Sequence, residues 1–250
     1  MKRRNIFPLL LVLCGALMMP GDGGEAQAAK KKKYKTGPVA NGGTLKGIIT
    51  LRGKVPKRGR LKVTKDAKTC GKFLPDQSLI VGRKGQLANV VIEIRGIRKG
   101  KKWNLPKTFR YDQKGCAFVP HVMILRPRAK GRVTNSDPLK HNFHTISKRI
   151  FNVNKTVGKG KSMKVKKNKI KRSGKIRVKC DLHEWMGGWW IVAKTPYIAL
   201  TDSQGRYTIT DIPPGKYKVR IWQERLGEIV RQVEIKPGGA ATLNLALKKR

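Results

Sequence analysis

The 250-residue sequence shows almost no helical periodicity, in which apolar residues would recur every three or four positions. Short runs instead alternate apolar and polar residues and end at Gly, Pro, Asn or Asp, which is typical of a β-sandwich protein. We therefore expect an all-β fold. The clearest predicted strands are 47–51, 90–94, 122–125, 176–180, 189–192, 217–222 and 243–247.

Acidic residues are scarce: 14 Asp and Glu stand against 58 Lys and Arg, so the net charge is +44. Such a surface attracts nucleic acid, anionic lipid or polysaccharide, or an acidic protein. Aromatic residues are absent between Asn152 and Cys180, where basic residues are dense. Proteins that bind single strands usually interleave aromatic platforms with basic groups, so this absence disfavours nucleic acid as a partner. We interpret the charge as a solvated surface that steers an acidic partner.

No apolar run is long enough to form a stable membrane-spanning helix. The longest, residues 6–19, follows a basic start at residues 1–4 and precedes Ala26-Gln27-Ala28. This arrangement predicts a signal peptide, residues 1–28, and hence an exported protein of the periplasm or cell envelope. A lipoprotein anchor at Cys14 is the alternative, although bulky Leu13 stands where a small residue is needed. Cleavage would leave a chain with a net charge of +43 and no expected transmembrane span.

Only four cysteines are present, and removal of the signal peptide would leave Cys70, Cys116 and Cys180. If Cys180 binds a metal as a thiolate, the other two are free to pair in an oxidising compartment. We therefore expect a disulfide between Cys70 and Cys116. Two unpaired thiols remain the alternative, because the sequence does not fix the distance between them.

Metal-binding groups are concentrated in one run that contains Cys180, His183 and Met186, and His141 lies upstream on a separate segment. One soft thiolate, two imidazoles and one thioether form a donor set that suits copper. A lone inward Cys, or a Met near a His, is more often core filler. The combined spacing at the end of an alternating strand predicts a metal site.

The strand before this run has a clear inward face. Ile176, Val178 and Cys180 alternate with Arg177 and Lys179, so the Cys180 thiol should point toward the core.

Four short motifs resemble the cupredoxins, the plastocyanin and amicyanin group, over roughly residues 104–194. They are Phe118-Val119-Pro120, Asn135-Ser136-Asp137-Pro138, His141-Asn142-Phe143 and Cys180-x2-His183-x2-Met186. The resemblance implies a Greek-key β-sandwich that binds one type 1 copper ion through His141, Cys180, His183 and Met186. It also implies that Asn142 ties the two ligand segments together and that His183 lies in an exposed loop, where the electron leaves.

Two further histidines depart from the simple family pattern. His144 lies three residues after His141, and such residues face opposite sides of a regular strand. His121 stands where the family has no ligand. We expect both outside the ligand set.

A second resemblance is carried by Asp202-x2-Gly205-x-Tyr207 and Pro213-Pro214-Gly215-x-Tyr217, which look like the carboxypeptidase regulatory-like domain, a small Ig- or prealbumin-like sandwich. The first half of that pattern occurs upstream, at residues 47–56 and 88–94. We predict a sandwich split in sequence, residues 43–103 plus 196–250, with a cupredoxin domain, 104–195, inserted and a basic linker at 29–42. A β-rich extension of the cupredoxin followed by a separate C-terminal domain is the alternative.

These features predict an exported blue-copper protein that carries one electron between periplasmic partners, such as an acidic c-type cytochrome or an oxidoreductase. No open coordination position, general base or substrate pocket can be identified in the sequence, so an enzyme is not expected. The alternative is a copper-handling protein or a cell-envelope binding or structural protein, with a carbohydrate-binding-like sandwich fastened by charge to an anionic envelope polymer. Zinc is a further alternative to copper, but Met is a poor zinc ligand.

Overall fold

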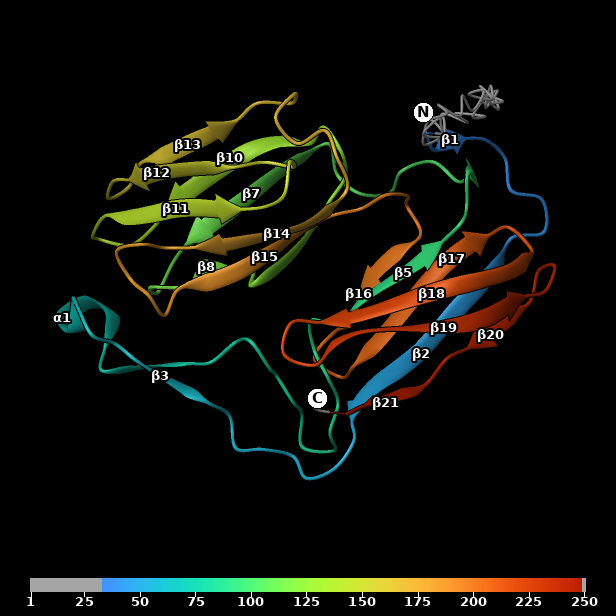
Figure 1. Ribbon diagram of the computed structural model, residues 1–250, viewed down its shortest axis with the longest axis horizontal. Coiled ribbons are helices and arrows are strands. Elements are labelled where there is room, and N and C mark those ends of the chain that lie inside the picture. The colour runs from blue at the N-terminus through green and yellow to red at the C-terminus, as the bar shows by residue number, and fades with distance from the viewer. Residues whose placement is uncertain (1–32, 249–250) are drawn as a thin grey trace, which may run out of the picture. The chain divides into compact units, whose positions relative to one another are not determined.

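The structure is a computed structural model that describes residues 33–248, and its regular secondary structure is almost wholly β-strand (Figure 1). The expected signal peptide, residues 1–28, lies outside the described residues. Within 33–248 the single helix is α1 (Ala67–Cys70), so the all-β prediction is confirmed. No helix in this part of the chain is long and apolar enough to cross a membrane.

One pair of sheets combines strands from the two ends of the described chain (Figure 1). β2 (Gly43–Leu51) pairs antiparallel with β17 (Arg206–Ile212), and β5 (Val91–Arg95) pairs antiparallel with β18 (Gly215–Gln223). Their inward residues, among them Leu45, Ile92 and Val219, form one buried cluster. In spatial order, one sheet holds β16 (Ile198–Leu200), β5 (Val91–Arg95), β18 (Gly215–Gln223) and β19 (Gly227–Ile235), and the other holds β17 (Arg206–Ile212), β2 (Gly43–Leu51) and β20 (Ala240–Thr242), with β21 (Leu245–Leu247) also paired to β2.

The second pair of sheets lies between these strands in sequence and surrounds a separate, aromatic core. The rings of Tyr111, Phe118, Phe143 and Trp190 contact one another there, with centroid separations between 5.2 and 6.2 Å. One sheet holds β13 (Ser162–Val165), β10 (Lys130–Asn135), β7 (Thr108–Gln113) and β8 (Phe118–Val119), and the other holds β12 (Val153–Val157), β11 (His141–Ile146), β14 (Gly174–Lys179), β15 (Gly187–Val192) and β9 (Val122–Leu125).

A long connection between β2 and β5 carries α1 and a small ribbon of β3 (Arg60–Lys62) and β4 (Phe73–Pro75) (Figure 1). We call residues 59–78 the strap, because backbone hydrogen bonding closes it at Gly59 and Asp76. The predicted disulfide between Cys70 and Cys116 is present and fastens the strap to the segment between β7 and β8. At the far end of the strap, Gln223 Nε2 donates to the Ser78 carbonyl oxygen at 2.7 Å.

Each strand predicted from alternation is present, with ends displaced by a few residues. The motif Pro213-Pro214-Gly215 forms a tight connection, because β17 continues to Ile212 and β18 begins at Gly215. The register of β17 shifts between Ile209 and Ile212, and Asp211 has a φ of 53°, so a β-bulge precedes this connection.

Part of the segment expected as a linker is paired with other strands. β1 (Lys35–Thr36) pairs parallel with β6 (Lys99–Gly100), and the Tyr34 ring lies edge-on to Trp103 and Tyr197. The boundaries of the two predicted domains stay a prediction.

Candidate metal centre

Two neighbouring strands and one loop bring the predicted donors together. β11 begins at His141, and Cys180 directly follows β14, which pairs antiparallel with β11. The loop that follows closes on itself, because the Cys180 N–H donates to the Met186 carbonyl and the Met186 N–H donates to the His183 carbonyl. Ile176 and Val178 are fully buried and Cys180 is 2 % exposed, so the predicted inward face of this strand is confirmed.

Three donor atoms face a common point in the interior. His141 Nδ1 lies 3.0 Å from His183 Nδ1, and Cys180 Sγ lies 3.6 Å from His183 Nδ1. The donor atoms of the three residues all lie within 4.8 Å of one another, and the three side chains are buried. Met186 is also buried and packs in the same apolar cluster as Cys180. The assignment of these four residues as copper ligands stays a prediction, and the structure brings together the donor atoms of three of them, His141, Cys180 and His183.

Each imidazole is held from behind by a carboxylate. His141 Nε2 lies 2.7 Å from Asp137 Oδ2, and His183 Nε2 lies 2.9 Å from Asp66 Oδ2. We assign the ring proton to Nε2 in both residues, because an ionised carboxylate can only accept. This tautomer directs the Nδ1 lone pair of each ring toward the other ring. Two facing lone pairs at 3.0 Å require a proton or a metal cation between them, so the donor set fits a cation.

Burial acts in opposite ways on the two kinds of donor. It raises the pKa of the Cys180 thiol and so opposes the thiolate that a metal binds, while the backbone N–H of Asn142 lowers that pKa in part. It also lowers the pKa of His141, against the opposing effect of the hydrogen bond to Asp137, and so favours the neutral ring that a metal ion requires.

Asn142 ties the two ligand segments together, as predicted. Its backbone N–H donates to Cys180 Sγ at 3.2 Å, and its side-chain Oδ1 accepts from the Asp181 N–H at 3.2 Å. The sulfur position is therefore fixed by the strand that carries His141.

The two remaining histidines bind other carboxylates. His121 Nε2 lies 2.9 Å from Glu224 Oε2, and His144 Nδ1 lies 2.9 Å from Asp181 Oδ2. Both lie outside the group of converging donors.

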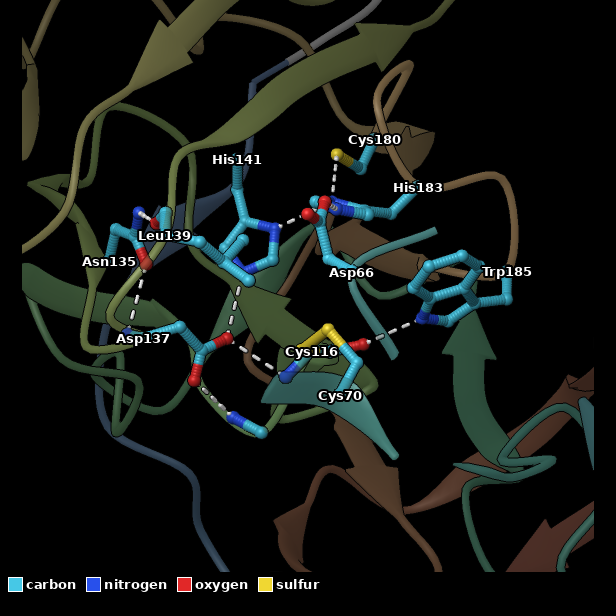
Figure 2. The surroundings of a disulfide bond; sticks show 11 residues. Asp66, Cys70, Cys116, Asn135, Asp137, Leu139, His141, Cys180, His183 and Trp185 are labelled. Atoms are coloured by element: carbon cyan, nitrogen blue, oxygen red, sulfur yellow. Dashed lines mark hydrogen bonds and ion pairs between the residues drawn. A yellow bond between two sulfur atoms is a disulfide. The ribbon is translucent and has the colours of Figure 1, made fainter. Parts of the chain in front are cut away.

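The loop that carries His183 is exposed at Asp181 and Glu184, but the expectation that His183 itself is exposed is wrong. The His183 side chain is 1 % exposed. Asp66 of the strap covers one edge of its ring, and the centroid of the Trp185 ring lies 5.0 Å from the centroid of the imidazole. Figure 2 shows Asp66 and the Cys70–Cys116 disulfide beside the two histidines. This cover could not be predicted from the sequence, because no sequence pattern places residue 66 beside residue 183.

Asp137 is the second carboxylate that sequence reasoning did not assign. Its oxygens accept hydrogen bonds from the backbone N–H groups of Gly115 and Cys116 at 2.6 and 2.8 Å (Figure 2). A signal was available, since Asp137 belongs to the motif at 135–138 and stands four residues before His141.

A cleft of about 660 Å³ lies beside the ligand loop. Cys180 and Met186 line this cleft, and Leu61, Leu74 and Asp76 contribute the strap side. His183 is not among the residues that line it.

A protein-family model matches the C-terminal part of the chain. Residues 191–248 match the family model of the carboxypeptidase regulatory-like domain, which confirms that resemblance. No curated protein matches the chain.

Cupredoxins stand among the similar solved structures. They include a novel purple cupredoxin from Nitrosopumilus maritimus, at 16 % identity over 34 % of this chain and 98 % of that chain, with a TM-score of 0.29. An amicyanin variant in its reduced state has 14 % identity over 34 % of this chain and 81 % of that chain, with a TM-score of 0.30. A copper-containing nitrite reductase from Thermus scotoductus has 16 % identity over 35 % of this chain, with a TM-score of 0.32, and the match spans 23 % of its length. At these TM-scores the likenesses carry no weight in the assignment of the site.

Proposed function

We propose that the protein is an exported type 1 copper protein that carries one electron between redox partners and does not act as an enzyme. The observation that carries the proposal is the convergence of His141 Nδ1, His183 Nδ1 and Cys180 Sγ in the interior, with the two Nδ1 atoms 3.0 Å apart. The buried thioether of Met186 on the same loop favours copper over zinc.

The residues around this point hold the donors in place and exclude water. The carboxylates of Asp137 and Asp66 fix the planes of the two rings, and the Asn142 N–H fixes the sulfur. Bound copper would supply a one-electron change at a site whose geometry suits both oxidation states. Because the donors are buried, and hydrogen bonds hold both rings and the Cys180 sulfur, little rearrangement should accompany electron transfer.

The surface charge fits an acidic redox partner, such as a c-type cytochrome or an oxidoreductase. A net charge of +44 would raise the rate of encounter with such a protein. An anionic polymer of the cell envelope is the other class of partner that the charge would attract.

The test is the visible spectrum of the oxidised, copper-loaded protein. We expect the intense thiolate-to-copper band of a type 1 site, and Cys180→Ser should abolish it because the band requires the thiolate. Glu184→Gln is the matched control, since this polar side chain lies on the same loop and belongs to no donor group; it should leave the band in place. A copper complex with only weak d–d absorption would contradict the electron-transfer proposal and favour copper handling.

A further inference from the structure

Asp66 occupies the position that begins α1, but its side chain does not cap the helix. An Asp at this position usually accepts a hydrogen bond from a backbone N–H of the first turn. Here the side chain makes no capping bond, and Oδ2 lies 2.9 Å from His183 Nε2. The Asp66 backbone is in the left-handed region, with a φ of 55°. The Asp66 carboxylate therefore contacts His183, 117 positions away, and does not cap α1.

The contact covers the Nε2 edge of His183, which points away from the other donors. Nδ1 faces His141 and Cys180, while Nε2 faces Asp66. The side chain of Asp66 is 41 % exposed, whereas that of His183 is 1 % exposed. Asp66 thus stands between the imidazole and the solvent.

The disulfide connects this cover to the support of the other imidazole. Cys70 is the last residue of α1, Asp66 is its N-cap residue, and Cys70 is bonded to Cys116. The backbone N–H of Cys116 donates to Asp137, the carboxylate that holds His141, and the Cys116 carbonyl accepts from Trp185 Nε1 at 3.2 Å. Figure 2 shows both carboxylates and both histidines around this one disulfide. A single covalent link therefore anchors the groups behind both rings.

We infer that Asp66 is a positioning residue for His183, that it shields the Nε2 edge of the ring from solvent, and that the Cys70–Cys116 disulfide holds it there. The importance of this cover for copper rests on the proposed function, but the cover itself does not. It can therefore be tested in the metal-free protein.

The first experiment measures the reaction of the metal-free protein with diethyl pyrocarbonate, which acylates accessible imidazole nitrogens. Peptide mass spectrometry would give the rate at each histidine, with half-exposed His144 as the internal reference. We expect slow modification of His183 in the wild type and a rise of about tenfold in Asp66→Ala, the factor for loss of one hydrogen bond to a charged group. Asp66→Asn should stay protected, because the amide oxygen still accepts from Nε2–H.

The matched control is Asp76→Ala. Asp76 lies on the same strap and carries the same charge, but it accepts from the Ser78 N–H and lies near Arg225. This variant should leave His183 protected. The double variant Cys70→Ser with Cys116→Ser should raise the modification rate as Asp66→Ala does, although Asp66 is still present. Modification of wild-type His183 as fast as His144, or unchanged protection in Asp66→Ala, would overturn the inference.

A second readout separates positioning from simple covering. In the copper-loaded protein, Asp66→Asn should raise the reduction potential, because a negative charge that favours the oxidised ion is lost while the hydrogen bond remains. Asp76→Asn should change it much less. An equal rise in both variants would show that Asp66 has no special coupling to the site. If no type 1 copper binds at all, the proposed function fails, and the acylation rates still decide whether Asp66 covers His183.

Discussion

The two imidazoles of the candidate site are held by carboxylates of very different character. Asp137 is buried and accepts backbone hydrogen bonds from Gly115 and Cys116, so His141 is supported by a rigid group. Asp66 is exposed and belongs to the strap, so His183 is supported by a group that depends on the anchoring of a long connection. At the scale of single residues, His141 is therefore the better fixed of the two predicted ligands.

This difference leads to a prediction for His141. Substitution by Gly should leave a cavity beside a sulfur and a second imidazole that stay in place, so added imidazole should restore the type 1 band of the copper-loaded variant. Titration of the variant with imidazole, followed by visible absorption, measures the restoration.

The control for this prediction is His144→Ala, on the same strand. His144 contacts Asp181 and lies outside the converging donors, so its removal should leave most of the band in place. If His144→Ala bleaches the site and His141→Gly does not, His141 is not the first ligand.

At the scale of elements, β14 shows how far the sequence alone could predict the site. Its alternation set the burial of Ile176, Val178 and Cys180, because neighbouring residues of a strand face opposite sides. The strap could not be predicted in the same way. The position of Asp66 depends on a left-handed backbone conformation and on a disulfide between residues 46 positions apart. Neither leaves a periodic signal in the sequence.

The pairing of Cys70 with Cys116 followed from counting cysteines, but its role did not. The count gave a bond between two residues and no information about what stands beside them. The structure shows that the bond joins α1, next to Asp66, to the turn whose N–H groups hold Asp137. This arrangement depends on the turn at Gly115 and Cys116 and on the length of α1.

β14 also carries a stability prediction. Ile176 is fully buried in the aromatic core, so Ile176→Ala should lower the free energy of unfolding by about 2–5 kcal/mol through lost burial and a residual cavity. Arg177→Ala, an exposed neighbour on the same strand, should change it by no more than about 0.5 kcal/mol. Denaturant unfolding of both metal-free variants measures the difference, and equal losses would mean that the strand does not face the core as described.

At the scale of the whole described chain, the sheets and the charge have to be considered together. Strands near residues 43–51 and 91–95 share sheets with strands from 198–247, and the candidate donors lie in the sheets between them in sequence. A third buried cluster, with Val122, Ile191, Ile198 and Trp222, includes strands of both pairs of sheets. Periodicity predicted the individual strands, but the pairing of distant strands required a resemblance, because alternation carries no information about partners.

The excess of basic residues extends to the strap that covers His183. Lys65, Lys68 and Lys72 are exposed there, before, within and after α1. A partner that approaches His183 from the strap side therefore meets positive charge first. If the proposed acidic partner docks on the strap rather than directly on the ring, these lysines should contribute more to the encounter than lysines elsewhere on the chain.

The last prediction tests this docking through ionic strength. Electron transfer from the reduced copper protein to an acidic c-type cytochrome should slow steeply as added salt shortens the Debye length from about 30 Å to about 8 Å. Replacing Lys65, Lys68 and Lys72 together by Gln should lower the rate at low salt and flatten the salt dependence. Stopped-flow absorption at several salt concentrations measures both effects.

The matched control replaces three exposed lysines of the other pair of sheets, Lys216, Lys218 and Lys236, by Gln. It removes the same charge from the whole molecule, so a smaller effect than that of the strap variant would place the docking surface at the strap. Equal effects of the two variants would mean that the total charge steers the partner and that the strap has no special part in docking. A rate that does not respond to salt in any of the three proteins would contradict electrostatic steering altogether, since charges on two exposed surfaces are screened within this range.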